Sequence, residues 1–139
     1  MKEYLVSNSD MESFFKLATE IAASSPSKKK VGAVLLKKNR VIVCATNNET
    51  KTHPIQAHWA RKVGRPQKIF LHAELSALVK AKEEGDKIIV ARLGGHNHDE
   101  LRMARPCPVC EAYLRECGIK DVYYSVTNNK WSYEHWGVD

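Results

Sequence analysis

Two apolar runs in the first third of the chain decide the fold. They are Val31-Gly32-Ala33-Val34-Leu35-Leu36 and Val41-Ile42-Val43-Cys44-Ala45, and the polar segment Lys37-Lys38-Asn39-Arg40 lies between them. Short apolar runs on either side of a turn indicate a β-hairpin. Because the runs are continuous rather than alternating, both faces of the strands are expected to be largely buried. The pair therefore predicts the centre of a layered domain.

Helical and strand patterns continue on both sides of this hairpin. Upstream, apolar residues at helical spacing follow Ser9 or Asp10, either of which can cap a helix, and this helix should end near Ser24-Ser25-Pro26. Downstream, we expect a helix over 72–84 stopped by Gly85, a strand at 88–91, a loop at 94–99, a helix over about 107–117 stopped by Gly118, and strands at 122–126 and 131–136. Residues 46–69 have poor periodicity, and a connection this long is often functional.

This order of elements predicts an α/β layered domain with a mixed sheet. The turn at Asn128-Asn129 is too short for a crossover, so the last two strands should be antiparallel. We expect one domain over residues 1–139, since that length is ordinary for a single domain. Trp131, Tyr133 and Trp136 on the last strand are expected to serve the core or a subunit interface.

Composition excludes several classes of protein. Hydrophobic residues make up 43% and charged residues 27%, as in ordinary globular proteins. No apolar run approaches the roughly 20 residues of a membrane helix, and the first residues lack the features of a signal peptide. The protein is therefore expected to be cytoplasmic. Its net charge of +6 suits nucleotides, nucleic acid or an acidic membrane surface, or solubility alone.

Two short segments carry the chemistry: His72-Ala73-Glu74 and Pro106-Cys107-Pro108-Val109-Cys110. In a chain without a secretory signal, a Cys-x-x-Cys pair indicates metal or redox chemistry rather than a disulfide framework. Catalytic zinc takes three protein ligands, and His72, Cys107 and Cys110 supply that number. Both segments are predicted at helix N-termini, which stabilise thiolates. Zinc lowers the pKa of its water toward about 7, and Glu74 is close enough to exchange protons with that water.

The two segments together resemble the H-x-E and P-C-x-x-C signature of the zinc-dependent cytidine and deoxycytidylate deaminase superfamily, without departure from it. The resemblance implies a three-layer α/β/α cytidine deaminase-like fold with a five-stranded mixed sheet, one catalytic zinc ion per subunit and a homo-oligomer. Glu74 would then be the catalytic proton shuttle. Asn48, or else Asn47, would contact the sugar or base, and the backbone at Ala73 and at Pro106-Cys107 would meet the base carbonyl. Lys51 and His53 are further candidates for substrate contact.

Other interpretations of these residues stay open. A fourth ligand from His96, His98 or Cys117 would close the site and make it structural. In that case the chain would be a non-catalytic zinc-stabilised binding module. Cys44 and Cys117 are expected to be packing residues.

Indications of the substrate are mixed. An antiparallel last strand pair resembles the deaminases of free nucleosides. Basic residues near the expected pocket suit a phosphate or a polynucleotide backbone instead; they are Lys28, Lys29, Lys30, Lys51, Arg61, Lys62, Arg65, Lys68, Arg102 and Arg105. An insertion at about 94–104 departs from the spacing of dCMP deaminases. We expect hydrolytic deamination of a cytosine nucleoside or nucleotide, and the alternative is editing of cytosine or tRNA adenine in single-stranded nucleic acid.

Overall fold

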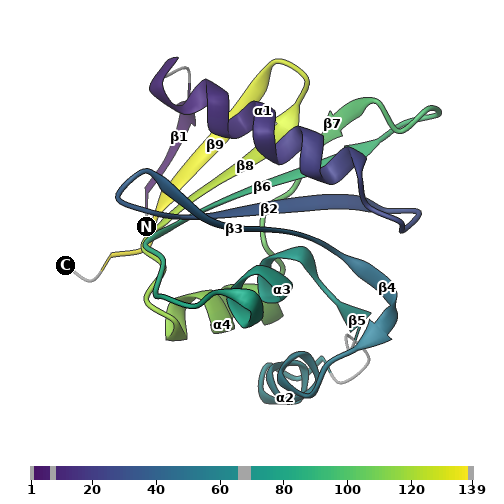
Figure 1. The fold of residues 1–139 in the computed structure, drawn as a ribbon, viewed down its shortest axis with the longest axis vertical. Helices are drawn as coiled ribbons and strands as arrows, with labels where there is room; N and C mark the ends of the chain where they lie inside the picture. Colours follow the sequence, from purple (N-terminus) through teal and green to yellow (C-terminus); the bar gives the residue numbers. More distant parts are fainter. Residues whose placement is uncertain (1, 7–8, 66–69, 138–139) are drawn as a thin grey trace.

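The computed structural model describes residues 2–6, 9–65 and 70–137 of the 139-residue chain, and side chains from residue 11 onward. Its elements follow one another along the chain as shown in Figure 1. They are β1 (Lys2–Val6), α1 (Ser9–Ala23), β2 (Lys30–Lys37), β3 (Arg40–Thr46), β4 (Asn48–Thr52), α2 (Pro54–Lys62), β5 (Phe70–Leu71), α3 (Ala73–Lys80), β6 (Lys87–Gly94), β7 (Glu100–Arg102), α4 (Pro108–Glu116), β8 (Asp121–Thr127) and β9 (Lys130–His135).

The main sheet is mixed, as the sequence predicts. Its strand order is β1-β9-β8-β6-β2-β3, with β7 paired to β6. β6 and β8 are parallel and are joined through α4, whereas the β8–β9 pair is antiparallel, which confirms the prediction for the end of the chain. All five predicted strands are present. The expected number is nevertheless too low, because β1 adds to β9 at one edge and β7 folds back on β6, making seven strands. β4 and β5 form a separate two-stranded sheet.

The predicted three layers are confirmed. α1 covers one face of the sheet, and α3 and α4 cover the other (Figure 1). On the α1 side, Phe15 stacks on Trp131 with ring centroids 4.3 Å apart, so Trp131 belongs to the core. α1 and β2 approach closely at Gly32, where a Cβ atom would lie 2.4 Å from the backbone nitrogen of Ala22. Glycine is therefore required for this contact.

Helix ends agree with the sequence except in one case. α1 ends at Ala23, and α4 is followed by Gly118 at φ +84°, both as predicted. α3 ends at Lys80, short of the predicted stop at Gly85. The backbone turns away early because Gly85 packs against the side chain of Leu35, and the next residue, Asp86, donates its N–H to the Leu36 carbonyl at 2.9 Å. Tertiary contacts thus override the helical preference of residues 81–84.

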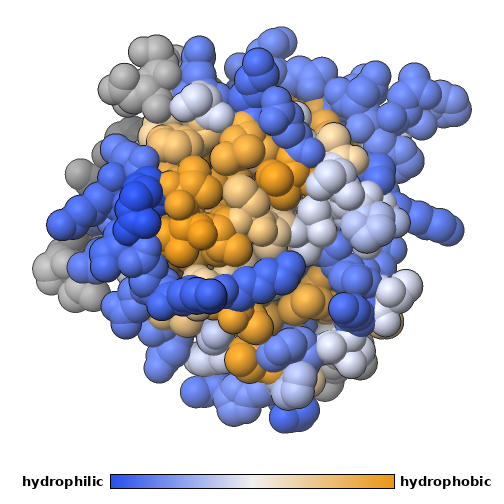
Figure 2. All heavy atoms as spheres, in the orientation of Figure 1, coloured by the Kyte–Doolittle hydropathy of each residue, from blue (hydrophilic) through white to orange (hydrophobic). Residues whose placement is uncertain are grey.

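The face seen in Figure 2 carries a broad apolar area. Figure 2 shows it at the centre of the face on which the edge strand β3 lies between α1 and α3. The apolar side chains of these elements that are exposed or only partly buried include Phe14, Leu17, Val41, Ile42, Val43 and Val79. Within the described ranges, no helix is long and apolar enough to cross a membrane.

Candidate metal centre

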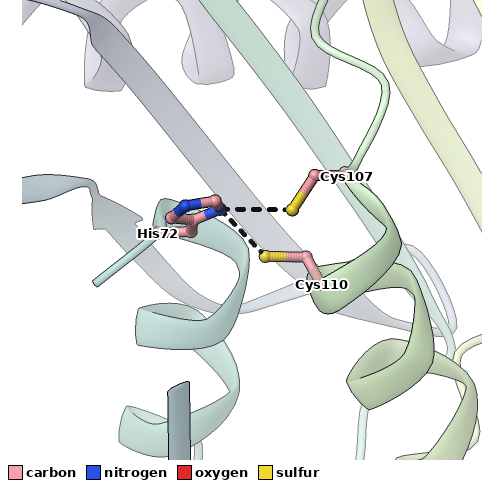
Figure 3. A group of neighbouring side chains, drawn as sticks. All are labelled: His72, Cys107 and Cys110. Carbon is pink, nitrogen blue, oxygen red and sulfur yellow. Dashed lines mark hydrogen bonds between the residues drawn. The ribbon is translucent and has the colours of Figure 1, made fainter. Parts of the chain in front are cut away.

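Three predicted ligands converge beneath the sheet at the ends of two helices (Figure 3). His72 immediately precedes α3 and Cys107 immediately precedes α4, while Cys110 lies in the first turn of α4. The Nδ1 atom of His72 is 3.5 Å from Sγ of Cys107 and 3.3 Å from Sγ of Cys110. The fully buried Gln56 of α2 accepts a hydrogen bond from the His72 backbone N–H at 3.4 Å. Two helix starts and a buried amide therefore fix the cluster.

The donor set fits a catalytic rather than a closed structural zinc site. One imidazole nitrogen and two sulfurs lie within 4.8 Å of one another, and no fourth His, Cys, Asp or Glu joins them in the part of the chain described. His96 and His98 are exposed in the turn between β6 and β7, and Cys117 lies at the opposite end of α4 from Cys107. These side chains are therefore not positioned to close the site. Three protein ligands are the usual number for catalytic zinc.

The two cysteines differ in their tendency to ionise. A hydrogen bond from the Cys110 thiol lowers the pKa of Cys107 to about 4, and His72 acts in the same direction. The pKa of Cys110 is raised, because its proton is shared with Cys107 and because the residue is buried. Cys107 is therefore the cysteine that ionises more readily of the two. A thiolate is the form that binds metal, so Cys107 favours the form that binds an ion.

Glu74 lies in the first turn of α3 and is buried. Burial raises the pKa of its carboxyl group, although the neighbouring His72 works against that rise. A carboxyl group with a raised pKa beside a metal site is suited to accept and return a proton.

A cavity of about 580 Å³ opens above the cluster. That volume is typical of small-molecule sites. Its walls come from the ends of β2, β3 and β6, the β4–β5 pair, and the starts of α3 and α4, and they include Lys29, Val31, Asn47, Asn48, Glu49, Phe70, Leu71, His72, Ala73, Glu74, Val90, Arg92, Ala104, Arg105 and Cys107. Of the residues predicted to touch substrate, Asn47, Asn48 and Ala73 line this cavity, whereas Lys51, His53 and Pro106 do not. The His53 side chain instead caps α2 by accepting from the Ile55 N–H at 3.1 Å.

The two asparagines are already engaged in hydrogen bonds. The Asn47 side chain accepts from Ser25 Oγ at 2.7 Å and from the Val31 N–H at 3.1 Å, and it donates to the Lys29 carbonyl at 2.7 Å. It therefore fixes the loop that leads from α1 into β2. The side-chain carbonyl oxygen of Asn48 accepts from the backbone N–H groups of Thr50 and Lys51 at 2.9 and 3.1 Å. Its amide nitrogen is the part of Asn48 best suited to a ligand.

The cations of the cavity differ from the predicted set. Within the predicted basic group only Lys29 and Arg105 line it, and Lys68 lies outside the described residues. Arg92 on β6 lines the cavity and was missed, because it stands on a strand predicted to end at residue 91. Alternation along that strand would have found it, since Val90 and Arg92 share one face and both line the cavity.

The chain is similar to known proteins in sequence and in fold. The family model described as the cytidine and deoxycytidylate deaminase zinc-binding region matches residues 8–126. The apo crystal structure of dCMP deaminase from the cyanophage S-TIM5 aligns with a TM-score of 0.58 and 24% identity over 86% of this chain and 84% of its own. The structure of that enzyme in complex with dCMP and dUMP aligns with a TM-score of 0.58 and 23% identity over 86% and 82%. At this identity the structures show a shared fold. No curated protein sequence matches the chain significantly.

Proposed function

The chain belongs to the cytidine and deoxycytidylate deaminase family, and on that premise we propose that it is a zinc-dependent hydrolase of a cytosine nucleoside or nucleotide. The observation that carries the proposal is the position of the His72, Cys107 and Cys110 cluster, with Glu74 beside it, at the base of a 580 Å³ cavity. In the reaction, water adds to C4 of cytosine and the bond from C4 to the 4-amino nitrogen breaks. Ammonia is released, and the product contains uracil.

His72, Cys107 and Cys110 would hold the ion. Bound zinc supplies Lewis acidity and makes hydroxide available near neutral pH. Glu74 takes a proton from the attacking water and returns it to the departing amine, for which its raised pKa is suited. Ala73 and Cys107, at the starts of α3 and α4, line the cavity, which supports a role for their backbone N–H groups in binding the base carbonyl.

The charge of the cavity supports a substrate that carries a phosphate. Lys29 and Arg92 line the cavity, and neither has an ion-pair partner among the residues described. Arg105 also lines it, but Glu134 and Glu111 neutralise its guanidinium group. Glu49 also lines the cavity, and its carboxylate accepts a hydrogen bond from the Lys29 backbone N–H at 2.7 Å. Two lining cations without an ion pair nevertheless favour a nucleotide over a free nucleoside.

The test is mass spectrometry of products from zinc-replete protein, with Glu74→Gln protein as the control. The panel contains cytidine, deoxycytidine, dCMP, dCTP, adenosine, and single-stranded DNA and RNA oligonucleotides. We expect conversion of a cytosine nucleotide, with loss of about 10²–10⁴-fold in rate for Glu74→Gln. Conversion of oligonucleotides alone would assign the chain to the editing deaminases. No turnover of any substrate by zinc-replete protein would overturn the proposal.

The apolar area around β3 supports a homo-oligomer. β3 is an edge strand, and its Val41 side chain is 38% exposed. Large exposed apolar areas often mark protein–protein contacts. Light scattering should therefore give more than one subunit per particle, and Val41→Glu should shift the particles toward monomer; a wild-type monomer at high concentration would argue against assembly.

A further inference from the structure

Arg105 connects the segment that carries the cysteines to two other elements. Its Nε atom donates to Oε2 of Glu134 on β9 at 2.6 Å, and its Nη2 atom donates to Oε1 of the same carboxylate at 2.9 Å. Its Nη1 atom lies 2.9 Å from Oε1 of Glu111 in the first turn of α4. Such a planar fork fixes direction as well as distance. Arg105 therefore joins the last strand to the helix of the metal ligands.

Glu134 is positioned firmly enough to act as the anchor. Its side chain is fully buried, although it belongs to a charged residue. It also accepts hydrogen bonds from the Tyr124 hydroxyl at 2.7 Å and from Nε1 of Trp136 at 3.0 Å. Arg105 is its only cationic partner within the described residues. Removing a carboxylate from water is unfavourable unless it is paired and hydrogen-bonded, so the position of Glu134 determines that of Arg105.

Both cysteine ligands lie in the segment between Arg105 and Glu111, the residue with which Arg105 pairs. The segment from Arg105 to Glu111 contains Cys107 and Cys110, together with the buried Pro106. The Glu111 N–H donates to the Cys107 carbonyl at 2.8 Å, which continues the constraint through the helix. With the Arg105 side chain bound to Glu111 at one end and to Glu134 outside the segment, the backbone has little freedom to separate the two Sγ atoms.

We propose that Glu134, acting through Arg105, is a positioning residue that holds the Cys107–Cys110 segment in the geometry required to bind one metal ion with His72. Glu134 does not line the cavity and cannot touch the substrate. Its effect is therefore on the metal centre and reaches the reaction only through it. The inference rests on the proposed function to the extent that the cluster must bind zinc.

The experiment compares Glu134→Gln with Tyr124→Phe. The Gln side chain keeps the shape of Glu134 and loses the charge that holds Arg105. Tyr124→Phe removes one buried hydrogen bond to the same carboxylate and leaves the Arg105 pair intact. The affinity for Zn²⁺ is measured by competition with a chelator, and the geometry is measured by the visible absorption of Co²⁺-substituted protein. Thermal unfolding of each variant gives its loss of stability.

We expect Glu134→Gln to weaken Zn²⁺ binding about 10–100-fold and to change the Co²⁺ spectrum. Tyr124→Phe should lose stability with wild-type metal affinity and spectrum. If Glu134→Gln also keeps both, at a similar loss of stability, the positioning role is overturned while the proposed function stands. If wild-type protein binds neither ion, the proposed function fails and this inference fails with it.

A second variant keeps the test decisive if Glu134→Gln does not fold. Arg105→Lys retains a cation for Glu134 but lacks the fork that reaches Glu134 and Glu111 together. Weaker Zn²⁺ binding by this folded variant, of the same order, would support the positioning role. Unchanged binding and an unchanged Co²⁺ spectrum would overturn it.

Discussion

The Nδ1 atom of His72 lies 3.3 Å from Sγ of Cys110, although 38 positions separate the two residues along the chain. This approach places the starts of α3 and α4 against each other, where both helix dipoles favour negative charge. Cys107 gains most from the arrangement, because the Cys110 thiol donates to it and lowers its pKa to about 4. The two cysteines of one motif are thus chemically distinct.

Alkylation of the metal-free protein should reveal this difference. Cys107 lines the cavity and is ionised well below the ordinary thiol pKa of about 8.5, so it should react with iodoacetamide even at about pH 6. Cys117 should be inert there, because burial raises its pKa. Zn²⁺ should protect Cys107. Peptide mapping by mass spectrometry measures each site, and equal labelling of Cys107 and Cys117 would show that the thiolate is absent.

Replacing the buried carboxyl group of Glu74 should stabilise the metal-free protein. Burial raises the pKa of Glu74 in the folded state, so its neutral form is favoured. Its contribution to stability is present below the unfolded pKa of about 4.3 and is lost as the pH rises through the folded value. Glu74→Gln should therefore raise the thermal midpoint at pH 7 and change it little at about pH 4.

Thermal unfolding of chelator-treated protein at the two pH values tests this prediction, with Glu84→Gln on the exposed segment after α3 as the control. The quantity to compare is the thermal midpoint of Glu74→Gln minus that of the wild type. If this difference is the same at both pH values, or is negative at pH 7, the folded protein does not favour the neutral form of the carboxyl group. A gain in stability with lost turnover would place Glu74 among residues kept for function at a cost in stability.

The metal ligands could be predicted because their spacing is local. His72-Ala73-Glu74 and Cys107-x-x-Cys110 each lie at a helix start, where sequence separation alone sets which side chains meet. The three side chains lie together in the structure, which is the arrangement expected if the two motifs form one site. The antiparallel pairing of the last two strands could also be predicted from local sequence, because a two-residue turn can join only antiparallel strands.

Features that depend on tertiary contacts could not be predicted in this way. β7 exists because the segment before the cysteines folds back on β6, and its Leu101 N–H is held by the Asn128 side chain at 2.6 Å. The pairing of Arg105 with Glu134 spans 29 positions and has no sequence pattern. Asn47 and Asn48 line the cavity, but their hydrogen bonds, with Ser25 after α1 and with Thr50 in β4, depend on contacts that the sequence pattern does not indicate.

Gly32 should be among the least replaceable glycines. An added Cβ would lie 2.4 Å from the Ala22 nitrogen and 2.7 Å from the Ala18 carbonyl oxygen, both backbone atoms that cannot rotate away. Gly32→Ala should therefore destabilise the fold by about 1–3 kcal/mol through overpacking. Gly64→Ala is the matched control, because nothing lies within 4 Å of its Cβ and only its φ of +76° opposes the change, at roughly 1 kcal/mol.

Urea unfolding measures both variants. A single cooperative transition is expected, because one sheet runs through the chain and a single domain of this size usually unfolds in two states. Equal losses for the two variants would show that α1 can move away from β2. Two separate transitions would contradict the prediction of one domain over 1–139.

A phosphate on the substrate should be recognised by Lys29 and Arg92. Each lines the cavity, and a charge-assisted hydrogen bond contributes about 1.5–3 kcal/mol. Losing a free energy of that size corresponds to a factor of about 10–100, so Lys29→Ala and Arg92→Ala should each raise KM for a cytosine nucleotide about 10–100-fold. KM for the matching nucleoside should not change, because the nucleoside lacks the phosphate that these cations bind.

The control is Lys28→Ala, which removes an adjacent exposed lysine that does not line the cavity. Steady-state kinetics on the nucleoside and nucleotide pair separate the cases: equal KM increases for both substrates would mean that Lys29 and Arg92 shape the cavity rather than bind phosphate, and the nucleotide would lose its support as the preferred substrate.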